Sequence, residues 1–212
     1  MKKNDGIIFD VDGTLWDSTE KVAAIYNRTI QESQNVLRDT PVTAELLKKE
    51  FGKPMIAIGY DLFPELSKDA CRSFMTSLCS RENQMLAQDP PSPYPGAVQT
   101  IRTLSLTHPV FIVSNCQGGY IELFIEAAGL SGCISGHLCP DDTGMEKAGN
   151  IREIISRHAL SAAVYVGDTF GDFLATKEAG IEFIHAAYGF GKVPDPDYII
   201  NQPADLLKLS NL

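Results

Sequence analysis

Two carboxylates near the start of the chain, Asp10 and Asp12, have the type and spacing that could hold a metal ion. They follow the apolar run Ile7-Ile8-Phe9, which is typical of a buried strand, and Gly13 comes directly after them. Two acids flanking one apolar residue repel each other unless a partner offsets their charge. A divalent cation is the usual partner, because hard cations prefer carboxylate and carbonyl oxygens. An ordinary acidic turn is the alternative interpretation.

Polar residues recur at two later positions where a strand ends or a helix begins. Ser114 and Asn115 close an apolar run, and their side chains could donate to phosphate oxygens or simply cap a helix. Lys147 lies in the first turn of an expected helix, where a cation is mildly unfavourable against the helix dipole. This placement hints at a purpose other than solvation, although a surface lysine is the alternative.

A second pair of acids, Asp168 and Asp172, follows another apolar run and is spaced by four residues. If a helix begins near Thr169, the two carboxylates lie one turn apart and can face the same point. In the alternative interpretation, Asp168 is a simple helix cap and Asp172 is a surface charge.

The elements that must position these residues alternate between strand and helix. Short β-rich runs occupy residues 7–10, 110–114, 163–167, 181–186 and 198–201, and helical patterns occupy residues 118–128, 146–158 and 170–179. This alternation predicts an α/β fold with right-handed crossovers and a mainly parallel sheet. Open sheets of this kind collect their ligands at the carboxyl ends of the strands, where the polar residues fall.

One long stretch departs from this alternation. Residues 17–88 contain no convincing strand, only helical segments interrupted near Pro41, at residues 52–54 and at residues 63–64, with a final helix capped by Ser67. Four prolines follow within residues 90–95, which excludes a helix or a central strand there. We therefore expect a core of residues 1–16 and 89–212, and a helical insert of residues 17–88.

Composition limits the possible partners. The 212-residue chain has a formal net charge of −9 and a pI of about 4.9, which argues against a nucleic-acid-binding protein. No apolar run approaches the length of a membrane helix, and the start of the chain lacks a signal-peptide pattern. The five cysteines show no metal-ligand spacing, which is typical of thiols in a reducing compartment. We expect a cytoplasmic protein with no nucleic-acid, membrane or obligate protein partner.

The order of these motifs resembles the haloacid dehalogenase superfamily, in the phosphatase-like branch that includes phosphoglycolate phosphatase and β-phosphoglucomutase. The resemblance rests on Asp10-x-Asp12-Gly13-Thr14, Ser114-Asn115, Lys147 and Gly167-Asp168-x-x-x-Asp172. It implies a Rossmann-like core with a helical cap domain inserted after the first strand. One departure is that Lys147 is followed by Ala148 and Gly149, where many members carry Pro.

The resemblance also implies roles for the catalytic residues. Asp10 would be the nucleophile that forms an aspartyl-phosphate, and Asp12 the general acid and base. Lys147 would neutralise the nucleophile and the phosphoryl oxygens. Because Asp12 must be protonated in the first step, we predict that nearby negative charge raises its pKa.

The remaining implied roles concern binding. Thr14, Ser114 and Asn115 would bind the transferring phosphoryl group. The resemblance implies a Mg²⁺ site formed by four acids, with Asp12 contributing its backbone carbonyl: Asp10, Asp12, Asp168 and Asp172. Mg²⁺ suits an all-oxygen site of this kind.

Specificity would come from the cap. The loop of residues 51–55 presents Lys53, which could meet a carboxylate or a second phosphate on the leaving group, or could be a surface lysine in a turn. The predicted function is a Mg²⁺-dependent phosphatase that hydrolyses a small phosphorylated metabolite, a phosphate monoester. A phosphomutase of the β-phosphoglucomutase type is the nearest alternative, and a non-catalytic binding protein with the same fold is a further one.

Overall fold

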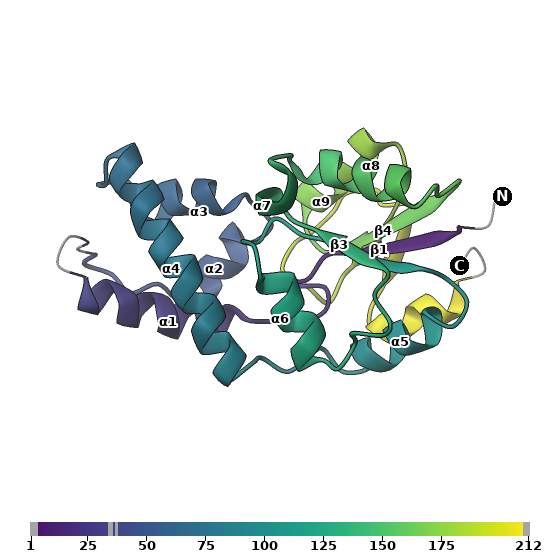
Figure 1. Cartoon of the computed structure of the whole chain (residues 1–212), viewed down its shortest axis with the longest axis horizontal. Helices are drawn as coiled ribbons and strands as arrows, with labels where there is room; N and C mark the ends of the chain where they lie inside the picture. Colours follow the sequence, from purple (N-terminus) through teal and green to yellow (C-terminus); the bar gives the residue numbers. More distant parts are fainter. Residues whose placement is uncertain (1–3, 34–35, 37, 210–212) are drawn as a thin grey trace.

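The described residues of the computed structural model, 4–33, 36 and 38–209, form one six-stranded parallel sheet with helices on both faces (Figure 1). The spatial order is β3-β2-β1-β4-β5-β6. In chain order the strands are β1 (Gly6–Phe9), β2 (Val110–Val113), β3 (Gly136–Leu138), β4 (Ala163–Gly167), β5 (Glu182–Ala186) and β6 (Tyr198–Ile200). The predicted α/β fold is confirmed. The sequence did not predict β3, because its residues Gly136, His137 and Leu138 form no apolar run.

Alternating side chains of the central strands face two separate cores. Ile7 and Phe9 of β1 pack on one side of the sheet with the larger core, and Ile8 packs on the other side with Tyr165 of β4. Strands buried on both faces read as continuous apolar runs, which is why β1, β2 and β4 were recognisable from sequence.

Two groups of helices cover these faces. The helices of this part of the chain are α5 (Ala97–Leu104), α6 (Tyr120–Ala127), α7 (Pro140–Thr143), α8 (Lys147–Arg157), α9 (Phe170–Ala179) and the 3₁₀ helix η1 (Pro203–Lys208). Helices α8 and α9 lie above the sheet in Figure 1, and α5 and α6 lie below it. Within the described residues, no helix has the length and apolar character needed to span a membrane.

Between β1 and β2 the chain forms four helices: α1 (Thr19–Glu32), α2 (Ala44–Glu50), α3 (Met55–Leu62) and α4 (Lys68–Gln88). We call these four helices and their connections the helical insert; they lie together at the left of Figure 1. The side chain of Ser67 accepts a hydrogen bond from the Ala70 amide, so the predicted cap of α4 is confirmed. The chain leaves and re-enters the core side by side, because Trp16 forms a bridge with Pro93.

The sheet order brings the predicted motifs together. Strand β1 pairs with β2 on one side and β4 on the other, so Asp10, Ser114 and Asp168 follow three neighbouring strands. After β1 the chain adds β2 and β3 toward one edge of the sheet, then crosses back to add β4, β5 and β6 toward the other edge. Such a switch in direction forms a crevice at the carboxyl ends of the strands.

Candidate active site

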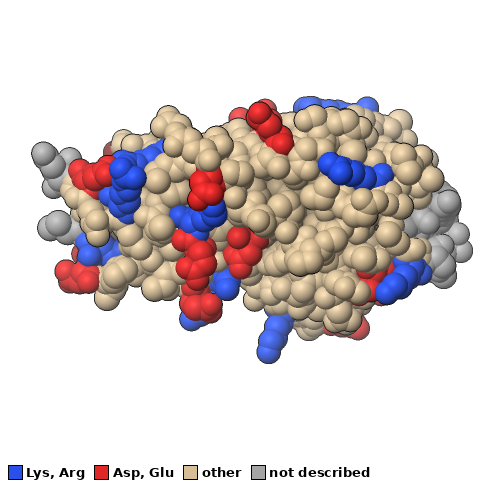
Figure 2. Space-filling view, turned by 90° about the horizontal axis from the view of Figure 1, so that it is seen from below, with Lys and Arg blue, Asp and Glu red and all other residues tan. Residues whose placement is uncertain are grey.

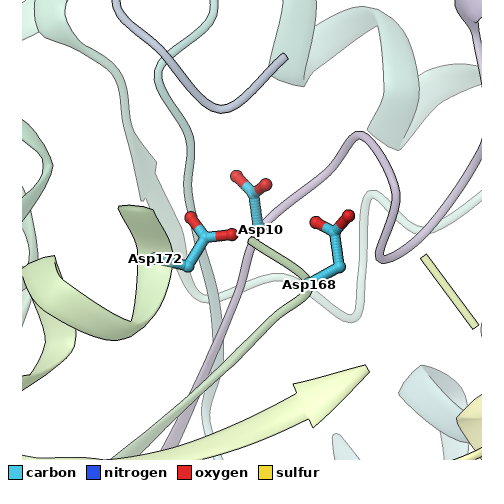
Figure 3. A group of neighbouring side chains, drawn as sticks. All are labelled: Asp10, Asp168 and Asp172. Carbon is cyan, nitrogen blue, oxygen red and sulfur yellow. The ribbon is translucent and has the colours of Figure 1, made fainter. Parts of the chain in front are cut away.

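Three carboxylates from separate segments meet at this crevice (Figure 3). Asp10 follows β1, Asp168 follows β4, and Asp172 lies in the first turn of α9. All three are buried, and one oxygen of each lies within 4.8 Å of the others. The structure thus brings Asp10, Asp168 and Asp172 together at one point, as the sequence predicted.

Lys147 is the cation that faces this cluster. It is the first residue of α8 and only 4 % exposed, so it is not a surface lysine. Its Nζ donates to Asp10 Oδ1 at 3.0 Å and to Asp172 Oδ1 at 2.5 Å. Burial lowers the pKa of Lys147, but the two carboxylates outweigh burial and leave the pKa above its ordinary value.

Lys147 alone does not offset the charge that all three acids would carry when ionised. Burial raises the pKa of Asp10 to about 6, while Lys147 opposes that rise. The pKa of Asp168 is also raised, by burial and then by the charges of Asp172 and Asp10. With one ammonium against three carboxylates, the oxygen-only donor set fits a hard divalent cation.

The start of α9 explains how Asp172 is aimed. Thr169 caps the helix by accepting a hydrogen bond from the Asp172 amide, so Asp168 is not the cap. Oxygen Oδ2 of Asp172 accepts in return from the amide and hydroxyl of Thr169. This reciprocal capping box leaves Oδ1 directed to Lys147.

Asp168 is fixed by the chain segments around it. Its Oδ2 accepts from the Phe190 amide at 2.7 Å, and the Thr14 hydroxyl lies 3.5 Å from its Oδ1 as a donor. Gly13 has a φ of +78°, and a Cβ there would lie 2.2 Å from Asp168 Oδ2. Only glycine permits this approach of the two motifs.

Asp12 lies beside the cluster and accepts from neutral donors. Its Oδ1 receives hydrogen bonds from Trp16 Nε1 at 3.1 Å, Ser18 Oγ at 2.6 Å and Tyr120 Oη at 2.8 Å. The pKa of Asp12 is raised to about 7, in the predicted direction. The main cause is burial rather than the predicted negative charge, and the charge of Asp10 contributes less.

The predicted phosphoryl-binding residues adjoin this cluster. Ser114 is buried at the end of β2 and lowers the pKa of Asp10 through a hydrogen bond. Asn115 Nδ2 donates to the Gly52 carbonyl of the helical insert at 2.8 Å, and its buried Oδ1 has no hydrogen-bond partner. Thr14 is fully buried, with its hydroxyl on Asp168. Their role in binding phosphate stays a prediction.

The helical insert closes directly over the acids. A cavity of about 20 Å³ lies between the insert and the rest of the chain. It is lined by Asp10 and Asp12 on one side and by Lys53 and Glu82 of the insert on the other. A space of that size holds about one water molecule. Lys53 Nζ is bound by Glu50 Oε2 at 2.6 Å and Asp61 Oδ2 at 2.8 Å, so its charge is already neutralised.

Sequence reasoning did not identify several residues that shape this site. Ser18 and Tyr120 bind Asp12, and Gln117 binds Glu82. Glu82 carried a recognisable signal, because it interrupts the buried stripe of α4, in which the other members are Cys71, Met75, Leu78, Cys79 and Leu86. An acid on the buried face of an amphipathic helix needs a reason.

Comparison with known proteins identifies the family. The model of the haloacid dehalogenase-like hydrolases matches residues 7–186. The chain is 28 % identical to a phosphoglycolate phosphatase of Aquifex aeolicus (strain VF5), over 96 % of this chain and 95 % of the relative. It is 23 % identical to the pyrophosphatase PpaX of Bacillus velezensis, over 100 % and 98 % of the two chains.

A solved structure agrees in fold. A haloacid dehalogenase-like family hydrolase from Streptococcus pneumoniae superposes with a TM-score of 0.79 at 23 % identity, over 97 % of each chain. The chain belongs to the haloacid dehalogenase-like hydrolases. The predictions of this family and of an enzyme are thereby confirmed.

Proposed function

We propose that the protein is a Mg²⁺-dependent phosphatase that hydrolyses a small phosphate monoester through an aspartyl-phosphate on Asp10. The observation that carries this proposal is the cluster of Asp10, Asp168 and Asp172 with Lys147 bound to two of them. Phosphoryl transfer depends mostly on positioning and charge neutralisation, which such a cluster supplies. Relatives named as phosphatases support the same reaction class.

The side chains divide the reaction between them. Asp10 Oδ attacks phosphorus while the P–O bond to the leaving alcohol breaks, and Asp12 gives that alcohol a proton. Asp12 then removes a proton from the water that hydrolyses the acyl phosphate. Lys147 reduces the repulsion between the nucleophile and the anionic ester. Residues Asp10, Asp168 and Asp172, with the Asp12 carbonyl, would hold Mg²⁺, which supplies further charge neutralisation at the phosphoryl oxygens.

We propose further that the helical insert is a cap domain, with domain ranges of 17–88 for the cap and 1–16 and 89–212 for the core. Positions 1–3, 34, 35, 37 and 210–212 of these ranges lie outside the described residues. The cavity of about 20 Å³ beside Asp10 is too small for a phosphoryl group, which supports an insert that moves to admit substrate. The adjacent crossings at Trp16 and Pro93 support a hinge there.

The first experiment measures phosphate release with Mg²⁺ from p-nitrophenyl phosphate and from a panel of metabolite phosphates. We expect Asp10→Asn to lower the rate by at least about 10³-fold, because the amide cannot act as the nucleophile. Asp69→Asn, at an exposed position in the first turn of α4, is the matched control and should keep the wild-type rate.

Other outcomes separate the alternatives. Phosphate release by Asp10→Asn near the wild-type rate would refute the nucleophile assignment. Isomerisation of β-glucose 1-phosphate without net phosphate release would identify a phosphomutase. Failure of the wild-type protein to bind Mg²⁺ and beryllofluoride would favour a non-catalytic binding protein.

A further inference from the structure

The helical insert brings little positive charge to the space above the nucleophile. Of the insert residues that line the small cavity, Lys53 is the cation and Glu82 the acid. Lys53 is held by Glu50 and Asp61 at hydrogen-bond distance, so those two acids outweigh it. A carboxylate or second phosphate on the leaving group would therefore meet a net acidic surface, contrary to the role that the sequence suggested for Lys53.

Glu82 presents the chemistry that this surface offers instead. It lies on α4, is 3 % exposed, and its Oε1 accepts from Gln117 Nε2 at 2.9 Å. Its Oε2 is buried beside the Tyr26 hydroxyl, and no hydrogen bond of good geometry reaches it. A buried carboxylate oxygen without a well-placed donor is costly, and a ligand that donates to this carboxylate lowers that cost.

The surroundings of Glu82 fix its position. Gln117 also donates to Asn83 Oδ1 at 2.9 Å, and Asn83 Nδ2 donates to the Gly118 carbonyl at 2.8 Å. The insert and the loop after β2 are thereby joined next to Glu82. On its other side lies Tyr26, whose buried hydroxyl faces the Glu82 carboxylate; burial and then the charge of Glu82 raise the pKa of Tyr26.

The cavity continues outward past these residues. A groove of about 810 Å³ shares four lining residues with it: Met55, Asn115, Cys116 and Gln117. The groove is lined by one arginine, Arg72, and by one acid, Asp141. Gln117, the hydrogen-bond partner of Glu82, therefore lines both the cavity at Asp10 and the groove into which a leaving group can extend.

We infer that Glu82 selects phosphate esters whose leaving alcohol carries a hydrogen-bond donor, a hydroxyl or an ammonium group, and rejects those that carry an anion. This inference rests on the proposed phosphatase function and assigns its substrate class. It separates the chain from its relatives named for phosphoglycolate and pyrophosphate, both of which have anionic leaving groups. A site built around a buried polar group discriminates strongly against ligands that leave it unpaired.

The test uses four phosphate esters with two-carbon leaving groups. These are 2-hydroxyethyl phosphate, phosphoethanolamine, ethyl phosphate and 2-phosphoglycolate. The far end of their leaving groups carries a hydroxyl, an ammonium, a methyl and a carboxylate group, respectively. The assay is run with Mg²⁺ at pH 8, above the value of about 7 to which burial raises the pKa of Glu82. We expect kcat/KM for one or both donor-bearing esters to exceed that for 2-phosphoglycolate by at least about tenfold.

The variant Glu82→Gln removes the charge and keeps the shape. It should lower the ratio of kcat/KM for phosphoethanolamine to that for 2-phosphoglycolate by at least about tenfold. Glu82→Leu should also lower the ratio for 2-hydroxyethyl phosphate relative to ethyl phosphate. Because each ratio is measured within one preparation, a partly unfolded variant gives the same value as a fully folded one.

A control variant tests whether any acid of the insert has the same effect. Glu65→Gln removes an exposed acid of the insert and should keep the wild-type ratios. If it changes them as Glu82→Gln does, the effect belongs to the net charge of the insert and the inference is wrong.

The outcomes separate this inference from the function beneath it. No phosphate release from these esters, pyrophosphate or p-nitrophenyl phosphate would refute the phosphatase itself. Phosphate release with a preference for 2-phosphoglycolate or pyrophosphate, or with ratios unchanged in Glu82→Gln, would overturn the inference and leave the phosphatase standing.

Discussion

Asp10 and Asp12 are two positions apart, yet their side chains lie in different chemical settings. Asp10 accepts from the ammonium of Lys147, whereas Asp12 accepts from neutral indole and hydroxyl donors. An ammonium stabilises a carboxylate more than a neutral donor does. Burial accordingly raises the pKa of Asp12 to about 7 and that of Asp10 to about 6. This inequality suits the proposed nucleophile and proton donor.

The close approach of Gly13 to Asp168 predicts that adding a single methyl group at position 13 destabilises the protein. Gly13→Ala must adopt a positive φ and also place Cβ against the Asp168 carboxylate. We expect the free energy of unfolding to fall by about 2–5 kcal/mol, measured by urea titration.

Gly144→Ala is the matched control for this substitution. Gly144 has a φ of +71°, close to that of Gly13, but a Cβ there would have no neighbour within 4 Å. Its loss should be about 1–2 kcal/mol, the cost of the backbone conformation alone. Equal losses in the two variants would show that Asp168 moves aside freely.

At the scale of elements, the capping box of α9 connects helix stability to the aim of Asp172. Thr169→Ala removes the hydroxyl that accepts from the Asp172 amide and donates to its carboxylate. We expect a loss of about 1 kcal/mol in the free energy of unfolding. Thr169→Ser keeps the hydroxyl and should lose less than half of that; similar losses would assign the effect to the methyl group.

The elements that the sequence predicted are those with strong local patterns. Apolar runs and an adjacent cap were sufficient for β1, β4 and α9, whose residues 170–179 match the prediction. Strand β3 at the sheet edge is only half-buried over Gly136 and His137, so it carries little apolar signal. Local patterns reach only as far as neighbouring residues.

The partners of the site residues could not be predicted because they come from distant segments. Tyr120 donates to Asp12 across 108 positions of the chain, and Gln117 donates to Glu82 across 35. The neutralisation of Lys53 by Asp61 likewise depends on how the loop meets α3. Motifs can predict which residues form the site, but partners from distant segments set the pKa or neutralise the charge of each site residue.

Over the whole molecule, surface and interior differ in their charge. Figure 2 shows acidic and basic side chains interspersed on one face, across the part that the insert forms. In the interior, Asp10, Asp12 and Glu82 all have raised pKa values because burial disfavours their charged forms. Folding therefore becomes less favourable as these buried acids ionise.

This gives a prediction for the pH dependence of stability. The pKa of Glu82 is about 7 in the folded state against 4.5 for an ordinary glutamate, so the folded chain binds the proton more tightly. Its stabilising contribution is full below pH 4.5 and is lost as pH rises through 7. In EDTA, the free energy of unfolding of Glu82→Gln should increase by roughly 3 kcal/mol relative to that of wild type as the pH rises from below 4.5 to above 7.

Urea titrations at several pH values measure this difference. A difference between Glu82→Gln and wild type that stays constant over this range would show that Glu82 stays solvated in the folded protein.

The central place of β1 in the sheet also sets an order of events during translation. Both neighbours of β1 are made later, and 100 residues separate Phe9 from Val110. At about 5–20 residues per second, β1 waits roughly 5–20 s on the ribosome before its first partner is synthesised. Strand β4 follows later still. The helices of the insert emerge during this interval, and their contacts are local enough to form first. The apolar strand β1 thus stays without either sheet partner until β2 has been synthesised.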